Sequence, residues 1–407
     1  MSGAPDKFDV GGVRLSQPFK IRRLGHFGFN LSDMEAGLRF YVDLLGFRIS
    51  DTIDYSRRAK NPAELADCGD PNGYFTRYGT DHHAMVLFPK RVRDALGRHE
   101  RLGITVNQVT WQVGSLAEVA SAIRWFHQRG IKQQRSGRDM PGSNWHTYLY
   151  DPDGHSNELY YGIEQIGWNG HSKPRAMYDR GFDHPPELPQ ISEFAEVEQA
   201  RAAGLDLLSG YRHVERLAAS FDVDGVLLPR PFKIVRLGPI YLFTDDLEAA
   251  AEFYRGALGF TLTEVIVWRG ERCLFLRANT EHHSVALFPI KLRDLLGLSP
   301  HSKCAALGLQ LANYRQLKSA VAFFREHGVA VSESLPHELH PGIEYSATIR
   351  DPDGHTLQLY YAMEQIGWDG RPRPSNLRTA RKLSDWPETV DHDANAYLGE
   401  PFLGPWG

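Results

Sequence analysis

Hydrophobic and polar residues near the start of the chain follow the pattern of a strand, a helix and three more strands. Residues 23–30 (RLGHFGFN) form a short alternating run, which predicts a strand. The segment 33–46 carries apolar residues at helical spacing; Ser32 or Asp33 can cap it, and Gly46 ends it. Three short runs typical of strands come next, at 47–53, 73–78 and 82–88.

The same order of elements then begins again. Residues 107–113 (NQVTWQV) predict a strand, and the spacing of apolar residues from Leu116 to Arg129 predicts a helix that stops at Gly130. Three more strand-like runs close this second unit, at 131–134, 146–150 and 157–161. The first 170 residues therefore contain two units of one strand, one helix and three strands.

A long internal repeat gives the second half of the chain the same organisation. Thirteen of the eighteen residues in 8–25 recur in 221–238 at an offset of 213. Fourteen of the twenty residues in 151–170 recur in 351–370 at an offset of 200. The offset falls because the first copy is longer by thirteen residues around 54–72.

The repeat predicts the arrangement of the domains. We expect an α+β protein in which four βαβββ units pair into two domains by tandem duplication, the first at 8–170 and the second at 221–370. Between them we expect a partly helical connector at 171–220. After them we expect a tail at 371–407 that contains Pro and Gly and covers the surface.

Composition is that of an ordinary globular protein, with 407 residues, 42% hydrophobic and 24% charged. The formal net charge is -4 and no Lys/Arg-rich stripe is present, so we expect no nucleic-acid partner. No apolar run approaches the roughly 20 residues that span a bilayer, and no basic-then-apolar leader begins the chain. The three cysteines (Cys68, Cys273 and Cys304) fit neither a disulfide frame nor a zinc ribbon, so we expect a cytoplasmic protein. We also expect a homo-oligomer without a membrane partner.

The residues around the DPDGH turn resemble those of a known family. The turn ends at His155, Glu158 follows in the next predicted strand, and His26 lies in the opening strand. Together with four βαβββ units, this combination resembles the vicinal oxygen chelate superfamily, which includes glyoxalase I, bleomycin-resistance proteins and type I extradiol ring-cleaving dioxygenases. The stretch GRDMPGSNWHTYLYDPDGHSNELYY (137–161) is most similar to the dioxygenases.

The resemblance implies a divalent metal in the first domain, held by His26, Gln108 and Glu158. Fe(II) is the first expectation for this metal, and Mn(II) or another ion is the second. The dioxygenases have a histidine where this chain has Gln108, whose neutral amide is a weaker ligand. The second copy has none of these ligands at the equivalent positions, which are Pro239, Ala306 and Gln358. We therefore expect one metal per chain.

Further residues of the first domain are candidates for catalysis. Neighbours on a strand point to opposite faces, so one of His82 and His83 should face the site, although the second copy keeps both as histidines. Tyr148 can contact substrate and assist proton transfer, and the second copy has Thr348 there. Four aromatic residues can wall an aromatic substrate, with core packing as their default role: Phe29, Trp111, Trp145 and Tyr160.

Three hypotheses of function follow. The resemblance implies a metal-dependent extradiol dioxygenase that cleaves a catechol-like substrate with O2 in the catabolism of aromatic compounds. Gln108 favours a non-oxidative lyase or isomerase of the glyoxalase type, in which the metal polarises a carbonyl. The third hypothesis is a metal-free protein that binds a small planar molecule, against which the intact His26 and Glu158 speak.

Overall fold

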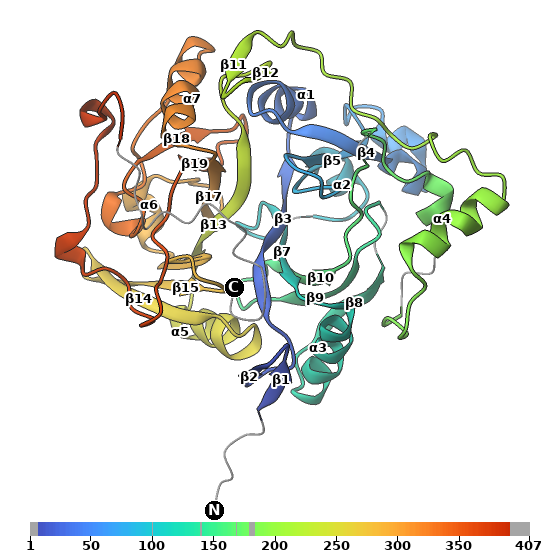
Figure 1. Cartoon of the computed structure of the whole chain (residues 1–407), viewed down its shortest axis with the longest axis horizontal. Helices are drawn as coiled ribbons and strands as arrows, with labels where there is room; N and C mark the ends of the chain where they lie inside the picture. The colour runs from blue at the N-terminus through green and yellow to red at the C-terminus, as the bar shows by residue number, and fades with distance from the viewer. Residues whose placement is uncertain (1–6, 100, 139–140, 168, 179–183, 391–407) are drawn as a thin grey trace, which may run out of the picture.

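The structure is a computed structural model that describes residues 7–99, 101–138, 141–167, 169–178 and 184–390. Two modules, each built around one large sheet, lie side by side in it (Figure 1). Module one runs from β3 to β10 and lies on the right of the view, and module two runs from β13 to β19 and lies on the left.

Module one contains two βαβββ units. The first comprises β3 (Ile21–Leu31), α1 (Met34–Leu38) with a π-helical continuation (Arg39–Leu44), β4 (Arg48–Asp54), β5 (Asn72–Arg77) and β6 (Met85–Pro89). The second comprises β7 (Val106–Val113), α3 (Leu116–Gln128), β8 (Gln133–Arg138), β9 (Trp145–Tyr150) and β10 (Ser156–Tyr161). The strand order β4-β5-β6-β3-β7-β10-β9-β8 places the two opening strands, β3 and β7, next to each other at the centre and antiparallel.

Module two repeats this order with one strand fewer. Its units comprise β13 (Ile234–Thr244), α5 (Leu247–Glu252), β14 (Thr261–Trp268), β15 (Glu271–Arg277) and β16 (Val285–Pro289), then β17 (Cys304–Leu311), α7 (Tyr314–Glu326), β18 (Ser346–Arg350) and β19 (Thr356–Tyr360). The counterpart of β8 is reduced to a bridge between Ser332 and Thr348, followed by a 3-10 turn that Pro336 caps. The predicted α+β fold of two duplicated modules is confirmed.

The helices begin and end where their caps predict. Ser115 Oγ accepts a hydrogen bond from the Glu118 backbone N–H at the start of α3, and Gly130, with φ 68°, follows its end. The helix expected at 33–46 begins after Asp33 but changes to a π-helix at Arg39, where Leu45 N–H donates to the Phe40 carbonyl. The wider turns keep neighbouring aromatic residues of this segment buried together.

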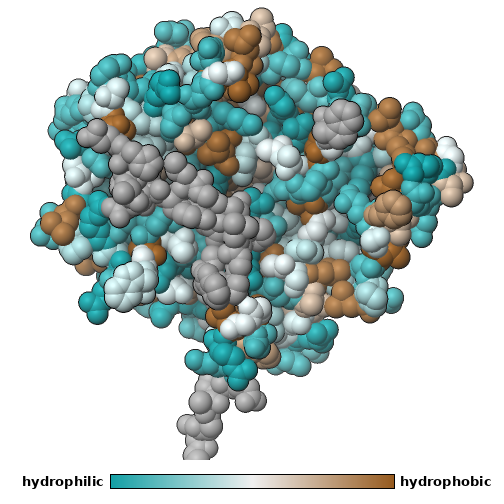
Figure 2. Space-filling model, viewed as in Figure 1, coloured by the Kyte–Doolittle hydropathy of each residue, from teal (hydrophilic) through white to brown (hydrophobic). Residues whose placement is uncertain are grey.

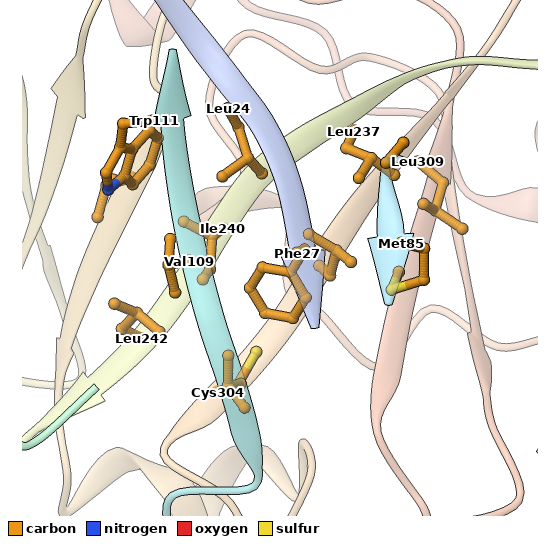
Figure 3. Close-up of a cluster of buried hydrophobic side chains, with 14 of the residues drawn as sticks. Leu24, Phe27, Met85, Val109, Trp111, Leu237, Ile240, Leu242, Cys304 and Leu309 are labelled. Carbon is orange, nitrogen blue, oxygen red and sulfur yellow. The ribbon is translucent and has the colours of Figure 1, made fainter. Parts of the chain in front are cut away.

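One hydrophobic core joins the two modules. Side chains from the central strands of module one, such as Leu24, Phe27 and Trp111, pack with Leu237 and Ile240 from the central strand of module two (Figure 3). All five are less than 5% exposed. The two sheets therefore bury their central faces against each other.

Each DPDGH turn reaches across this interface. Asp151 Oδ2 accepts a hydrogen bond of 3.0 Å from the Tyr254 hydroxyl of module two, and Asp351 Oδ2 accepts one of 2.9 Å from the Tyr41 hydroxyl of module one. The ring of His355 also stacks on Phe29 of the other module, with 4.1 Å between the ring centroids. The shared turn is therefore a structural contact in both copies.

Two further segments pack on the modules. The α4 helix (Glu193–Ala202) is tied to module one by an ion pair of 2.9 Å between Glu196 and Arg138. Residues 371–390 pack on module two, where Arg378 pairs with Glu264 at 2.7 Å; residues 391–407 of the expected tail lie outside the described residues.

Hydrophilic residues cover most of the face in Figure 2, and hydrophobic residues are scattered among them. Among the described residues, no helix combines the length and the hydropathy needed to cross a membrane.

Candidate functional site

Four neighbouring strands of module one bring a row of polar side chains together. His26 on β3 is paired with Thr110 on β7, Thr110 with Glu158 on β10, and Glu158 with Tyr148 on β9. Side chains of directly paired residues lie on the same face of a sheet, so these four form a row across it. Gln108, two residues before Thr110 on β7, shares that face.

The centre of the row is a buried carboxylate. Glu158 is fully buried, and its Oε2 lies 3.1 Å from His26 Nε2. The same oxygen accepts a hydrogen bond of 3.1 Å from the Thr110 hydroxyl, and Oε1 accepts one of 2.8 Å from the Asn144 amide. Burial alone would raise the pKa of Glu158, but His26 and the hydrogen-bond donors lower it to about 2. The group is therefore a carboxylate at neutral pH.

Of the two adjacent histidines, His83 faces this row. The centroid of its ring lies 4.3 Å from that of His26. The prediction that both histidines lie on a strand is wrong: β6 begins only at Met85, because the backbone bends so that His82 N–H donates to the Glu164 carbonyl. Burial lowers the pKa of His83 well below its usual value, and the ring is neutral.

A cavity of about 480 Å³ lies on the same side of module one, and three of the predicted site residues line it: His83, Gln108 and Tyr148. The Tyr148 hydroxyl lies 3.5 Å from Gln108 Oε1. His26 and Glu158 are 1% exposed or less and are not among the lining residues. Three of the expected residues thus line one cavity, and His26, which contacts Glu158, is buried next to His83.

The aromatic walls of this cavity differ from those expected. None of Phe29, Trp111, Trp145 and Tyr160 lines it. Phe29 and Trp111 belong to the shared core, and the Tyr160 ring lies 4.8 Å from that of His26. The lining aromatics other than Tyr148 are Tyr55, Phe75, Phe88 and Tyr150. Of these aromatic residues, only Tyr55 lies in a segment that stands out in the sequence, the insertion at 54–72 of the first copy.

The geometry of His26 and Glu158 fits two ligands of one divalent ion. Two ligand atoms each ~2.1 Å from a metal, at a right angle to one another, lie about 3 Å apart, and the observed separation is 3.1 Å. Imidazole and carboxylate are also ligand types that divalent transition-metal ions take. Within the described ranges no three His, Cys, Asp or Glu side chains are grouped to hold a metal.

Module two has the same strands at this place, but other residues occupy the positions of the candidate ligands. Tyr241 stands where module one has Gly28, and its hydroxyl lies 2.7 Å from Gln358 Oε1 and 3.1 Å from His283 Nε2. Gln358 and His283 are the counterparts of Glu158 and His83. The phenol of Tyr241 therefore fills the space between Gln358 and His283, which leaves no room for an ion at this place in module two.

Known proteins share both the sequence family and the fold. The model of the Glyoxalase/Bleomycin resistance protein/Dioxygenase superfamily matches residues 23–159 and 236–359, and the chain belongs to this superfamily. The expected family is thereby confirmed.

Two curated relatives are dioxygenases. Metapyrocatechase 2 of Cupriavidus necator is 30% identical over 196 residues, 47% of this chain and 53% of that protein. The 2,2',3-trihydroxybiphenyl dioxygenase of Sphingomonas paucimobilis is 26% identical over 164 residues, 39% of this chain and 54% of that protein. The match thus spans about half the length of each relative.

Solved structures share the fold at low identity. The 2,3-dioxygenase LapB from Pseudomonas sp. KL28 superposes with a TM-score of 0.54 at 15% identity, over 87% of this chain and 96% of that one. The Mn(II)-bound glyoxalase from Novosphingobium aromaticivorans superposes with a TM-score of 0.52 at 14% identity, over 93% and 97% of the two chains. Solved structures with this fold therefore include a 2,3-dioxygenase and a glyoxalase.

Proposed function

We propose that this protein is a metal-dependent extradiol-type dioxygenase that cleaves a catechol-like aromatic substrate with O2. The observation that carries the proposal is the buried pair of His26 and ionised Glu158, 3.1 Å apart, next to His83 in the wall of a cavity that also has aromatic walls. The matches to two dioxygenases support it. In this proposal the metal is Fe(II) in the first place and Mn(II) in the second.

Each site residue then has a role. His26 and Glu158 hold the ion, and Gln108, with its amide oxygen on the same face of the sheet, is the third ligand. A bound divalent ion would supply the Lewis-acid and redox chemistry that ring cleavage by O2 requires. His83, neutral because it is buried, accepts the proton of a substrate hydroxyl, and the Tyr148 hydroxyl orients a substrate oxygen.

Metal analysis and oxygen uptake test the proposal together. Protein purified without chelator should contain one equivalent of iron or manganese per chain and should consume one O2 per catechol as a ring-opened product appears. Metal-loaded protein that consumes no oxygen with any of a panel of catechols would refute the dioxygenase proposal.

A lyase or isomerase of the glyoxalase type is the second candidate, because the neutral amide of Gln108 stands where the dioxygenases have an imidazole. The same experiment separates the two. Nickel, cobalt or zinc in the purified protein, with no oxygen uptake, supports the second candidate.

A further inference from the structure

The cavity of module one carries a concentration of positive charge. Four arginines line it: Arg93, Arg98, Arg101 and Arg135. None of the lining residues that the structure describes is acidic. Because the whole chain has a net charge of -4, general composition does not account for this cluster.

Two of the arginines lie in the segment between α2 (Lys90–Ala95) and β7, and both are exposed: Arg98 and Arg101. The guanidinium carbon of Arg101 lies 3.8 Å from the centroid of the Tyr150 ring. Contact with a ring uses the face of a guanidinium and leaves its in-plane N–H donors for an acceptor. Arg101 is thus positioned by an aromatic wall of the cavity.

The second copy of the sequence lacks these two charges. The matching segments RDALG and RDLLG align the copies, and Leu298 then stands for Arg98 and His301 for Arg101. Module two has its own cavity, of about 680 Å³, in which Arg378 and Arg381 are paired with two of the glutamates that line it. Those lining glutamates are Glu264, Glu333, Glu338 and Glu344. The basic cavity therefore occurs in the module that has the candidate metal ligands.

We propose that the substrate of module one carries a carboxylate, which Arg98 and Arg101 bind while the catechol oxygens point toward His83, Gln108 and Tyr148. Guanidinium and carboxylate are both planar and pair through two parallel hydrogen bonds. A volume of about 480 Å³ suits an aromatic ring with a short acidic side chain. The assignment of the ring as a catechol rests on the proposed function; the assignment of the charge does not.

Binding of a matched pair of ligands tests this proposal. The full-length protein, as purified with its metal and kept under argon, is titrated by calorimetry with 3-(3,4-dihydroxyphenyl)propionate and with its primary amide, which has the same shape and no charge. The acid should bind about tenfold more tightly than the amide, because its carboxylate accepts charged hydrogen bonds from the guanidinium groups that the neutral amide cannot match. The preference should fall as salt rises.

The variants Arg98→Gln and Arg101→Gln should each reduce the preference severalfold, and the double variant should abolish it, while the affinity for the amide stays the same. Arg91→Gln is the matched control, because Arg91 is exposed on α2 and does not line the cavity. Equal binding of acid and amide by the wild type, or an effect of Arg91→Gln equal to that of Arg101→Gln, would overturn the proposal.

Oxygen uptake, measured in air, tests the proposed dioxygenase function separately. If the acid binds selectively and neither ligand is cleaved, the dioxygenase proposal fails and charge recognition stands. If both ligands are cleaved and bind equally, the dioxygenase proposal stands and charge recognition fails.

Discussion

At the scale of single residues, the charge of Glu158 is the feature on which the candidate site depends. Glu158→Gln keeps the shape of the side chain and removes the charge, and Gln358 already occupies the same place in module two. We expect the variant to lose most of its bound metal and its activity while its unfolding midpoint changes little. Metal content by elemental analysis, with circular dichroism as the control for folding, checks this. Wild-type metal content in the variant would show that Glu158 is not a ligand.

Gly28 is a second single residue on which the candidate site depends, because it has no side chain to fill the space between His83 and Glu158. Gly28→Tyr copies Tyr241, whose hydroxyl fills the corresponding space in module two. A Cβ at Gly28 would lie 3.1 Å from the Phe88 ring and 3.3 Å from Asn107 and Gln108, so the backbone position admits a side chain with small shifts. We expect metal binding to be lost in a folded protein.

The control for this variant is Gly28→Ala, which adds one methyl group and leaves the space between His83 and Glu158 open. It should keep most of the bound metal. Equal metal content in Gly28→Tyr and the wild type would mean that the ion, if bound, lies elsewhere.

The comparison of the two copies predicted which residues gather in the site, but not what surrounds them. Residues that differ between the copies, such as Glu158 and Tyr148, lie side by side on one face of the module-one sheet. Thr110 was missed because a hydroxyl on a buried strand is ordinary, and its contact with Glu158 depends on the register of two strands that are far apart in sequence. Arg101 was missed because an exposed arginine in a loop gives no signal until the sheet brings Tyr150 beneath it.

At the scale of elements, local spacing was a good guide to helices and a poorer one to strand ends. The helix predicted from Leu116 to Arg129 is observed as Leu116–Gln128. The strand expected at 131–134 is instead Gln133–Arg138, since its start depends on the hydrogen bonds that β9 offers. In the counterpart of this segment in module two, the pairing is confined to a single bridge.

The two DPDGH turns act as elements that hold the modules together. Burial, followed by the charge of Asp351, raises the pKa of Tyr41 well above its usual value, so its hydroxyl remains a donor at every accessible pH. Tyr41→Phe removes this hydrogen bond to a buried carboxylate and should lower the free energy of unfolding by about 1.5–3 kcal/mol. Urea denaturation measures the loss.

Tyr254→Phe is the matched variant, because Tyr254 makes the same contact with Asp151 from the other side of the interface. The pseudo-symmetry of the modules predicts a loss of similar size. If neither variant is destabilised, the turns do not contribute to the contact between modules.

At the scale of the whole molecule, the shared core implies that the two modules unfold together. Leu24 and Trp111 of module one and Leu237 and Ile240 of module two belong to one buried cluster. An isolated module would expose these side chains to water, with a cost of about 25 cal/mol for each Å² of apolar surface. A change within module two should therefore alter the stability of the entire chain, including the candidate site of module one.

Buried histidines of module two should make the free energy of unfolding of the whole chain depend on pH. Burial lowers the pKa of His340 to about 4 and that of His283 well below its usual value. Between about pH 6.5 and the lower pKa in the folded state, the unfolded chain binds protons that the folded chain does not, so the free energy of unfolding falls as the pH falls. The slope should be about 1.4 kcal/mol per pH unit for each such histidine.

Urea denaturation of the full chain in chelator, at steps between pH 7.5 and 5, measures this slope without a contribution from bound metal. The Nδ1–H group of the neutral His340 ring donates a hydrogen bond of 3.1 Å to the Ile343 carbonyl. His340→Asn retains a donor and removes the titrating group, so it should flatten the slope by about 1.4 kcal/mol per pH unit. Because the core is shared, a probe in module one, such as a fluorescent label on the partly exposed Cys68, should report the same midpoint as the circular dichroism of the whole chain. Two separate midpoints, with only one of them dependent on His340, would show that the modules unfold independently.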